Sequence, residues 1–243
     1  MTDENTHNRP DLLVETQWLA DHLDDPGLRI VDMGPIDAYK RAHIPGAMGL
    51  NRNYFKDSDN RVLVMGPDRF AEAIGEVGIG NEHDVIAYDD WGGLYAGRLW
   101  WLLRMHGHEK VRVLNGGWNK WISEGRPVEP APLATYHSGR PMSPHPPATF
   151  TPTLLPEYNC TLDQLKERLD EPGWVTLDVR TDDEYTGALT RGNKRGGHIP
   201  DTVHIEWTRA VTDDEFRTFL PPRELRELYE SAGITPEMKI VTY

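Results

Sequence analysis

Cysteine and basic residues are scarce in this sequence. Cys160 is the single cysteine among 243 residues, which excludes an intrachain disulfide and a zinc site built from cysteines. The 26 basic residues are outnumbered by 39 acidic ones, and the formal net charge is −13. We therefore expect no nucleic-acid partner and no binding to an anionic membrane surface. A local basic patch that binds a small anion is still compatible with this charge.

Long hydrophobic runs are also missing. The longest candidate, residues 99–103, is far shorter than the roughly 18 apolar residues that a membrane span requires. Residues 1–5 lack the basic and apolar regions of a signal peptide. We expect a cytoplasmic protein.

Several features occur twice, in the same order. The equivalent pairs are Asp32 and Asp178, Tyr39 and Tyr185, His43 and His198, and Tyr88 and Tyr243. The first two pairs are 146 residues apart and the last two 155, so the second copy has nine extra residues between its tyrosine and its histidine. Two copies at this spacing predict a tandem of domains. We place the first domain at residues 10–128, a proline-rich linker at 129–158 and the second domain at 159–243.

Each copy alternates helical patterns with short apolar strands. In the first copy we predict helices at 16–23, 67–77, 94–105 and 118–123, and strands at 28–32, 84–88 and 111–114. In the second copy we predict helices at 161–169 and 222–232, and strands at 174–178 and 239–243. This alternation favours an α/β fold in which each copy has a mainly parallel sheet covered by helices on both faces. The first copy continues about 40 residues past Tyr88, so we expect the second domain to be incomplete.

Four motifs connect this sequence to a known family. They are HIPGA at residues 43–47, DVR at 178–180 with GHIP at 197–200, YAGRLWW at 95–101 and LNGGW at 114–118. With them the sequence resembles the two-domain rhodanese-type sulfurtransferases, which use thiosulfate or 3-mercaptopyruvate. The resemblance implies tandem rhodanese-like domains, no cofactor, a monomer, and catalysis by the second domain only.

The resemblance also implies a mechanism. A cysteine directly after strand 239–243 takes a sulfane sulfur from a small anionic donor as a persulfide and passes it to a thiol or to cyanide. Amides of the loop that follows hold the sulfur anion and favour the thiolate. That nucleophile is expected at position 244, outside this chain, and its first-copy counterpart is Asp89, which cannot perform thiolate chemistry. The 243-residue chain is therefore expected to be inactive.

Three explanations for the missing nucleophile stay open. The sequence is truncated, or a selenocysteine codon at position 244 is misread as a stop, or the protein is a genuine short, non-catalytic one. Cys160 does not replace the nucleophile, because its repeat partner is Val14 at the entrance to a helix. We predict a structural role for this cysteine.

The insertion of the second copy supplies candidate substrate-binding residues. Arg191, Lys194 and Arg195 lie close together there, either as a solvated loop or as a clamp for the anionic donor. The resemblance favours the clamp, with Arg191 as first choice and Arg195 as second. Glu184 stands where family members often have an arginine.

Other polar residues are predicted to have structural roles. We expect Asp178 to bind the loop that follows it, and Arg180 to pair with Asp183 or Glu184. His198, like its counterpart in the first copy, is expected to fix a loop. His106 and His108 have the spacing of metal ligands, but no acidic or cysteine ligand accompanies them. We therefore expect a surface turn here and no metal site.

Thiosulfate is the expected donor. Mercaptopyruvate enzymes of this family tend to have a histidine where this sequence has Val64, and 3-mercaptopyruvate therefore remains the alternative donor. A non-catalytic rhodanese-like binding or regulatory module is the alternative of another class. A phosphatase-like relative would need a longer loop with its own cysteine and arginine, and the tandem arrangement argues against it.

Overall fold

The computed structural model describes the chain except residues 1–11, 52, 58, 61–62, 132–141 and 170. It divides into two compact units, Met1–Tyr158 and Asn159–Tyr243. Residues 10–11 of the predicted first domain and 132–141 of the predicted linker lie outside the described residues. Within the described part, no helix is long and apolar enough to cross a membrane.

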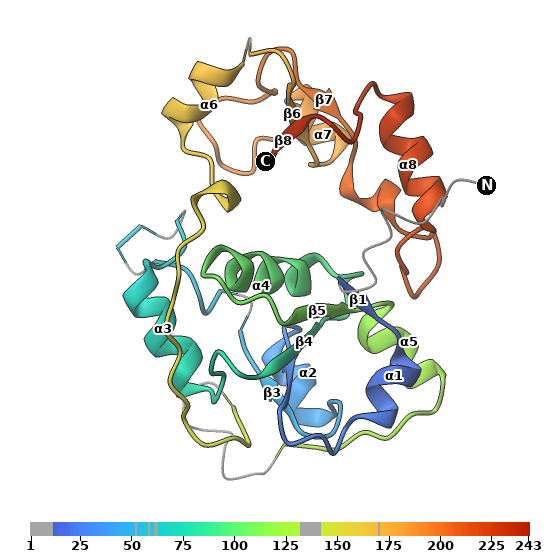
Figure 1. Ribbon diagram of the computed structural model, residues 1–243. Helices are drawn as coiled ribbons and strands as arrows, with labels where there is room; N and C mark the ends of the chain where they lie inside the picture. Colours follow the sequence, from blue (N-terminus) through green and yellow to red (C-terminus); the bar gives the residue numbers. More distant parts are fainter. Residues whose placement is uncertain (1–11, 52, 58, 61–62, 132–141, 170) are drawn as a thin grey trace, which may run out of the picture. The chain divides into compact units, whose positions relative to one another are not determined.

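Unit 1 is built on a parallel sheet of five strands in the order β1-β5-β4-β2-β3 (Figure 1). The strands are β1 (Leu13–Val14), β2 (Leu28–Asp32), β3 (Ala47–Gly49), β4 (Asp84–Tyr88) and β5 (Val111–Leu114). The register places Asp32 at the end of β2 opposite Tyr88 at the end of β4. These two residues therefore meet at the carboxyl edge of the sheet.

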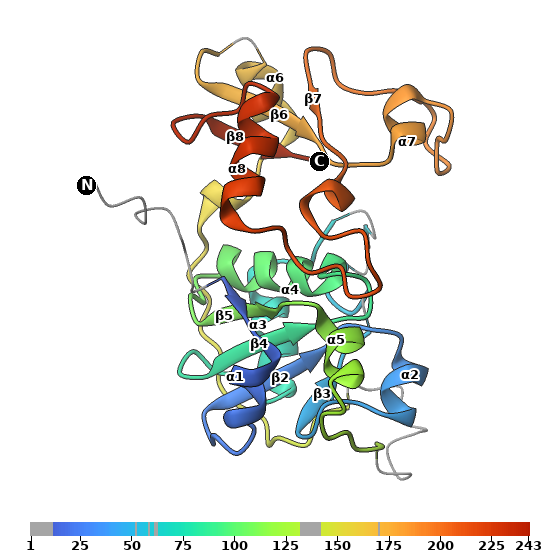
Figure 2. The same ribbon diagram turned by 90° about the vertical axis from the view of Figure 1, so that its right-hand side faces the viewer.

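Helices cover both faces of this sheet, as the sequence predicts (Figures 1 and 2). They are α1 (Thr16–Asp21), α2 (Ile36–Arg41), α3 (Pro67–Glu76), α4 (Leu94–Met105) and α5 (Gly117–Ser123). Successive strand residues point to opposite faces, so Val31 and Ala87 pack with α3 and α4, whereas Ile30 and Ile86 pack with α1, α2 and α5.

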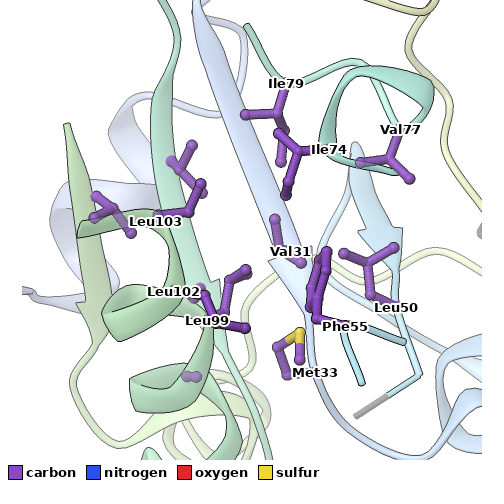
Figure 3. Close-up of a cluster of buried hydrophobic side chains, with 14 of the residues drawn as sticks. Val31, Met33, Leu50, Phe55, Ile74, Val77, Ile79, Leu99, Leu102 and Leu103 are labelled. Atoms are coloured by element: carbon purple, nitrogen blue, oxygen red, sulfur yellow. The ribbon is translucent and has the colours of Figure 1, made fainter. Parts of the chain in front are cut away.

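The larger core lies between the sheet and helices α3 and α4. Figure 3 shows Ile74 of α3 and Leu99 and Leu102 of α4 gathered around Val31 of β2. Phe150, from the proline-rich segment, completes this core. The described part of that segment is therefore packed on unit 1.

The prediction that His106 and His108 lie at the surface is wrong, because both histidines are buried, although residues 106–107 do form a turn. Nδ1 of His106 donates to the carbonyl of Leu102 at 2.8 Å, and its ring stacks on Phe70 at 4.0 Å. Burial lowers the pKa of both imidazoles. They are neutral core residues at the end of α4.

Unit 2 has a three-stranded parallel sheet in the order β7-β6-β8. Its strands are β6 (Trp174–Asp178), β7 (Val203–His204) and β8 (Lys239–Thr242). Its α-helices are α6 (Leu162–Arg168), α7 (Asp182–Thr186) and α8 (Pro222–Ser231), and short 3-10 turns span Pro156–Tyr158, before unit 2, and Trp207–Ala210. Thr161 caps α6 through a capping box with Gln164, which confirms the predicted helix start.

Candidate functional site

The candidate site lies where β6 and β8 end in unit 2. Tyr243, the residue after β8, donates its N–H to Leu177 and accepts a hydrogen bond from the N–H of Val179. Asp178, the last residue of β6, is fully buried beside it. In open parallel sheets, ligands bind outside the carboxyl ends of the strands, so this edge is the place to look for chemistry.

Arg180 folds back onto Asp178. Its Nε donates to Oδ1 of Asp178 at 2.9 Å. Its Nη2 donates to Oδ2 of Asp178 and also, at 3.1 Å, to the carbonyl of Gly197. The predicted pairing with Asp183 or Glu184 is therefore wrong, because the buried carboxylate only two residues away is the nearer partner. Burial raises the pKa of Asp178, but hydrogen bonds from Arg180 and Tyr243 outweigh it and hold this pKa below its usual value.

Tyr243 links this ion pair to the His-Ile-Pro segment. Its hydroxyl accepts a hydrogen bond from the N–H of Ile199 at 3.0 Å and donates one to Asp178. The guanidinium of Arg180 lies 4.8 Å from the centroid of the Tyr243 ring. Tyr243, the residue after β8, is thus held by its backbone, its hydroxyl and its ring.

His198 is engaged with the tyrosine of α7. Its Nδ1 donates to the carbonyl of Tyr185 at 2.8 Å, and the two rings stack at 3.8 Å. His43 and Tyr39 make the same pair of contacts in unit 1, at 2.8 and 3.9 Å. This repetition fits a loop-fixing role, because the first copy lacks a sulfur nucleophile.

His204 joins the same stack and was missed by the sequence reasoning. Its ring lies 4.2 Å from Tyr185, and its Nε2 donates to the carbonyl of Arg180 at 2.9 Å. The register of β7 places it opposite Asp178. The pairing of Tyr185 with Tyr39 in the repeat identified the tyrosine ring as part of the site. No pattern in the sequence indicated that His204 packs on this ring as a second histidine.

The insertion loop presents its three cations differently. Nε of Arg191 lies 2.6 Å from Oε1 of Glu184, while the arginine side chain stays 59% exposed. The hydrogen bond from Arg191 lowers the pKa of Glu184. Lys194 and Arg195 are exposed and form no ion pair within the described residues. The structure therefore brings Arg191 to α7 and leaves the other two cations in solvent.

Unit 1 shows what the loop after the equivalent strand can hold. Asp89 follows β4, and its carboxylate accepts four backbone hydrogen bonds of 2.7–2.9 Å. The donors are the N–H groups of Trp91, Gly93, Tyr95 and Ala96. The last two belong to the first turn of α4, so the helix dipole adds to the attraction for an anion. We call this arrangement the amide cradle, and its occupant is the buried side chain of Asp89 itself.

Cys160 lies at the start of the helix that precedes β6. It lies directly before Thr161, the N-cap of α6, and its Sγ is 3.6 Å from the carbonyl of that residue. Helix α6 then leads into the amino end of β6, opposite to the end where Asp178 lies.

Comparison with known proteins places the chain in a family. The model of the rhodanese-like domain matches residues 15–124 and 161–243, one match in each unit. The chain belongs to the rhodanese family. The resemblance predicted from the motifs and the predicted α/β rhodanese fold are thereby confirmed.

Relatives of this rhodanese include proteins named for sulfur transfer. The sulfur carrier protein TtuD of Thermus thermophilus is 34% identical over 96% of this chain and 82% of its own length. The thiosulfate sulfurtransferase of Bos taurus is also 34% identical, over 91% of this chain and 77% of its own. The structure of SseA, a 3-mercaptopyruvate sulfotransferase from Escherichia coli, matches with a TM-score of 0.82 and 25% identity, covering 95% of this chain and 87% of that one.

Proposed function

We propose that this rhodanese is a thiosulfate sulfurtransferase whose nucleophile directly follows Tyr243. The observation that carries this proposal is the amide cradle after β4, which holds the carboxylate of Asp89 with four N–H groups. By the correspondence of β8 with β4, the residues that would follow Tyr243 take the equivalent place in the second copy. With a cysteine or selenocysteine at its start, such a loop would hold a sulfur anion instead of a carboxylate.

The reaction takes two displacements at this nucleophile. The thiolate attacks the outer sulfur of thiosulfate, the sulfur–sulfur bond breaks, and sulfite leaves with the electron pair. Cyanide or a thiolate then attacks the persulfide sulfur, and the enzyme thiolate leaves. No oxidant or cofactor is needed. Amides aimed at the sulfur lower the pKa of the thiol and stabilise the anion that departs.

Cations of the insertion loop would bind the donor. Thiosulfate carries two negative charges, and the planar fork of Arg191 suits its oxygen atoms. Glu184 holds Nε of this arginine and leaves much of its side chain in solvent. Lys194 and Arg195 add exposed positive charge three and four residues later. We assign the clamp to these three residues.

3-Mercaptopyruvate is the alternative donor, supported by the structural similarity to SseA. A non-catalytic binding or regulatory module is the alternative of another class, and it predicts that no nucleophile follows Tyr243. Sequencing the gene past codon 243 and expressing the longer protein distinguishes between these alternatives.

The proposal is tested by mass spectrometry of that longer protein. After incubation with thiosulfate, the peptide that follows Tyr243 should gain one sulfur atom, and a later addition of cyanide should remove it. Sulfur on the peptide that contains Cys160 would overturn the proposed site. A gain of sulfur from 3-mercaptopyruvate but not from thiosulfate would establish the alternative donor.

A further inference from the structure

The two copies share a framework around the tyrosine at the carboxyl end of β4 and of β8. Tyr88 accepts a hydrogen bond from the N–H of Ile44 at 3.2 Å, as Tyr243 does from Ile199. Each tyrosine hydroxyl also donates to the aspartate of the neighbouring strand, Asp32 in the first copy. This framework alone does not distinguish the copy with the proposed activity.

The residue two positions after that aspartate does distinguish them. In unit 1 it is Gly34, whose N–H donates to Oδ1 of Asp32 at 2.7 Å. A Cβ at this glycine would lie 2.9 Å from the same oxygen and 3.6 Å from Oδ1 of Asp90. Unit 1 therefore has the carboxyl group of Asp90 near this position, whereas unit 2 has the side chain of Arg180.

Arg180 connects three parts of the unit 2 site at once. It binds both carboxylate oxygens of Asp178, the carbonyl of Gly197 at the end of the insertion loop, and the ring of Tyr243. Its own carbonyl accepts a hydrogen bond from His204. Only 27% of its side chain is exposed, so these contacts define its conformation.

We propose that Arg180 is a positioning residue for sulfur transfer, which sets the place of Tyr243, and so of the residue after it, relative to the insertion loop. The proposal rests on the function proposed above. The guanidinium ties the end of β8 to Gly197, the residue before His198. The distance between the cations that bind the donor and the nucleophile is thereby fixed. A lysine could not reproduce this role, because one ammonium lacks the planar fork that engages Asp178 and Gly197 together.

This assignment differs from a direct role in binding the donor. Only 27% of the Arg180 side chain is exposed and its Nε and Nη2 are bonded to Asp178 and Gly197, whereas Arg191 is 59% exposed. An arginine that positions the nucleophile should affect the rate of sulfur transfer more than the affinity for thiosulfate. A displacement of about 1 Å at a reacting atom can cost on the order of 100-fold in rate.

The test uses Arg180→Lys and Arg180→Gly, the latter installing the residue of the first copy. In the 243-residue chain, the NMR signals of the Tyr243 ring and the Ile199 amide should shift in both variants. In the protein expressed past codon 243, kcat per folded molecule should fall on the order of 100-fold for Arg180→Gly, with KM for thiosulfate changed less than about threefold. Arg223→Lys, at an exposed ion pair on α8, is the control and should change neither readout.

Two results would overturn the proposal. One is an unchanged Tyr243 signal in both variants, which would show that the ring is placed without Arg180. The other is a large rise in KM with kcat unchanged, which would make Arg180 a donor ligand. An inactive wild-type protein would instead contradict the proposed function, and the NMR shifts would still test the positioning of Tyr243.

Discussion

Asp32 and Asp178 occupy the same position in the two copies, yet their carboxyl groups have pKa values displaced in opposite directions. Burial raises the pKa of Asp32 to about 7, and the neighbouring carboxylates Asp90 and Asp89 add to the increase. Burial also acts on Asp178, but hydrogen bonds from Arg180 and Tyr243 bring its pKa below the usual value. Arg180 supplies hydrogen bonds that lower the pKa of Asp178, whereas in unit 1 Gly34 offers only its N–H and two further carboxylates stand near Asp32.

Asp32→Asn should stabilise unit 1 above pH 7. The unfolded carboxyl ionises near its ordinary value of 3.8, whereas the folded one keeps its proton until about pH 7. The free energy of unfolding therefore falls as pH rises through this window, by at most about 4 kcal/mol. Asparagine removes this loss and still accepts the bonds from Gly34 and Tyr88. Urea unfolding at pH 5 to 8 should show a flatter dependence than in wild type, and Asp37→Asn, at an exposed side chain, should behave like wild type.

Asp178→Asn should have the opposite effect on unit 2. Because the folded pKa of Asp178 is lowered, its contribution to stability is present above pH 4 and is lost as pH falls through the folded pKa. The variant leaves Arg180 without its anion, and we expect a loss of about 2 kcal/mol at pH 7. Hydrogen exchange of the β6 amides measures this loss. Protection equal to wild type would refute the role of this ion pair, and Asp163→Asn on α6 is a matched exposed control.

Gly117→Ala should disrupt the turn that supports Asp89. Gly117 has φ of +49°, and a Cβ there would lie 2.2 Å from the carbonyl oxygen of Asp89. Gly125 also has positive φ, of +66°, but has open space around it. We expect Gly117→Ala to destabilise unit 1 by about 3 kcal/mol and Gly125→Ala by about 1 kcal/mol, measured by denaturant unfolding. Equal losses of unfolding free energy in the two variants would show that the close contact with Asp89 adds nothing to the cost.

Arg191→Ala should raise KM for thiosulfate about tenfold and lower kcat less, because the arginine binds the donor in its ground state. Steady-state kinetics of the protein expressed past codon 243 measures both constants. Arg223→Ala is a control with an exposed arginine outside the insertion loop. A fall in kcat at constant KM would place Arg191 among the groups that act on the transition state instead.

The repeat made much of this fold predictable. The offsets of 146 and 155 residues located β2, β4, β6 and β8, because their apolar runs lead directly into the matching aspartates and tyrosines. The helices and strands that were missed are short: α2 and α7 have six and five residues, and β1, β3 and β7 have two, three and two. Segments of this length show no periodicity in the sequence, and tertiary contacts stabilise them.

The site was less predictable than the fold. The pairing of Arg180 with Asp178 depends on the backbone conformation after β6, which the spacing of charged residues in the sequence does not reveal. The pair of Arg191 and Glu184 joins α7 to an insertion that has no counterpart in the first copy. The burial of His106 depends on the ring of Phe70, on which it stacks, and on the carbonyl of Leu102, which accepts the hydrogen bond from Nδ1.

Thiocyanate formation from thiosulfate and cyanide is the most direct test of the account. It should be measured on the 243-residue chain, on the protein expressed past codon 243, and on that protein with serine at position 244. We predict turnover by the longer protein only, and its complete loss with serine. Thiocyanate production by the 243-residue chain, or by the serine variant, would contradict the proposal that the nucleophile directly follows Tyr243.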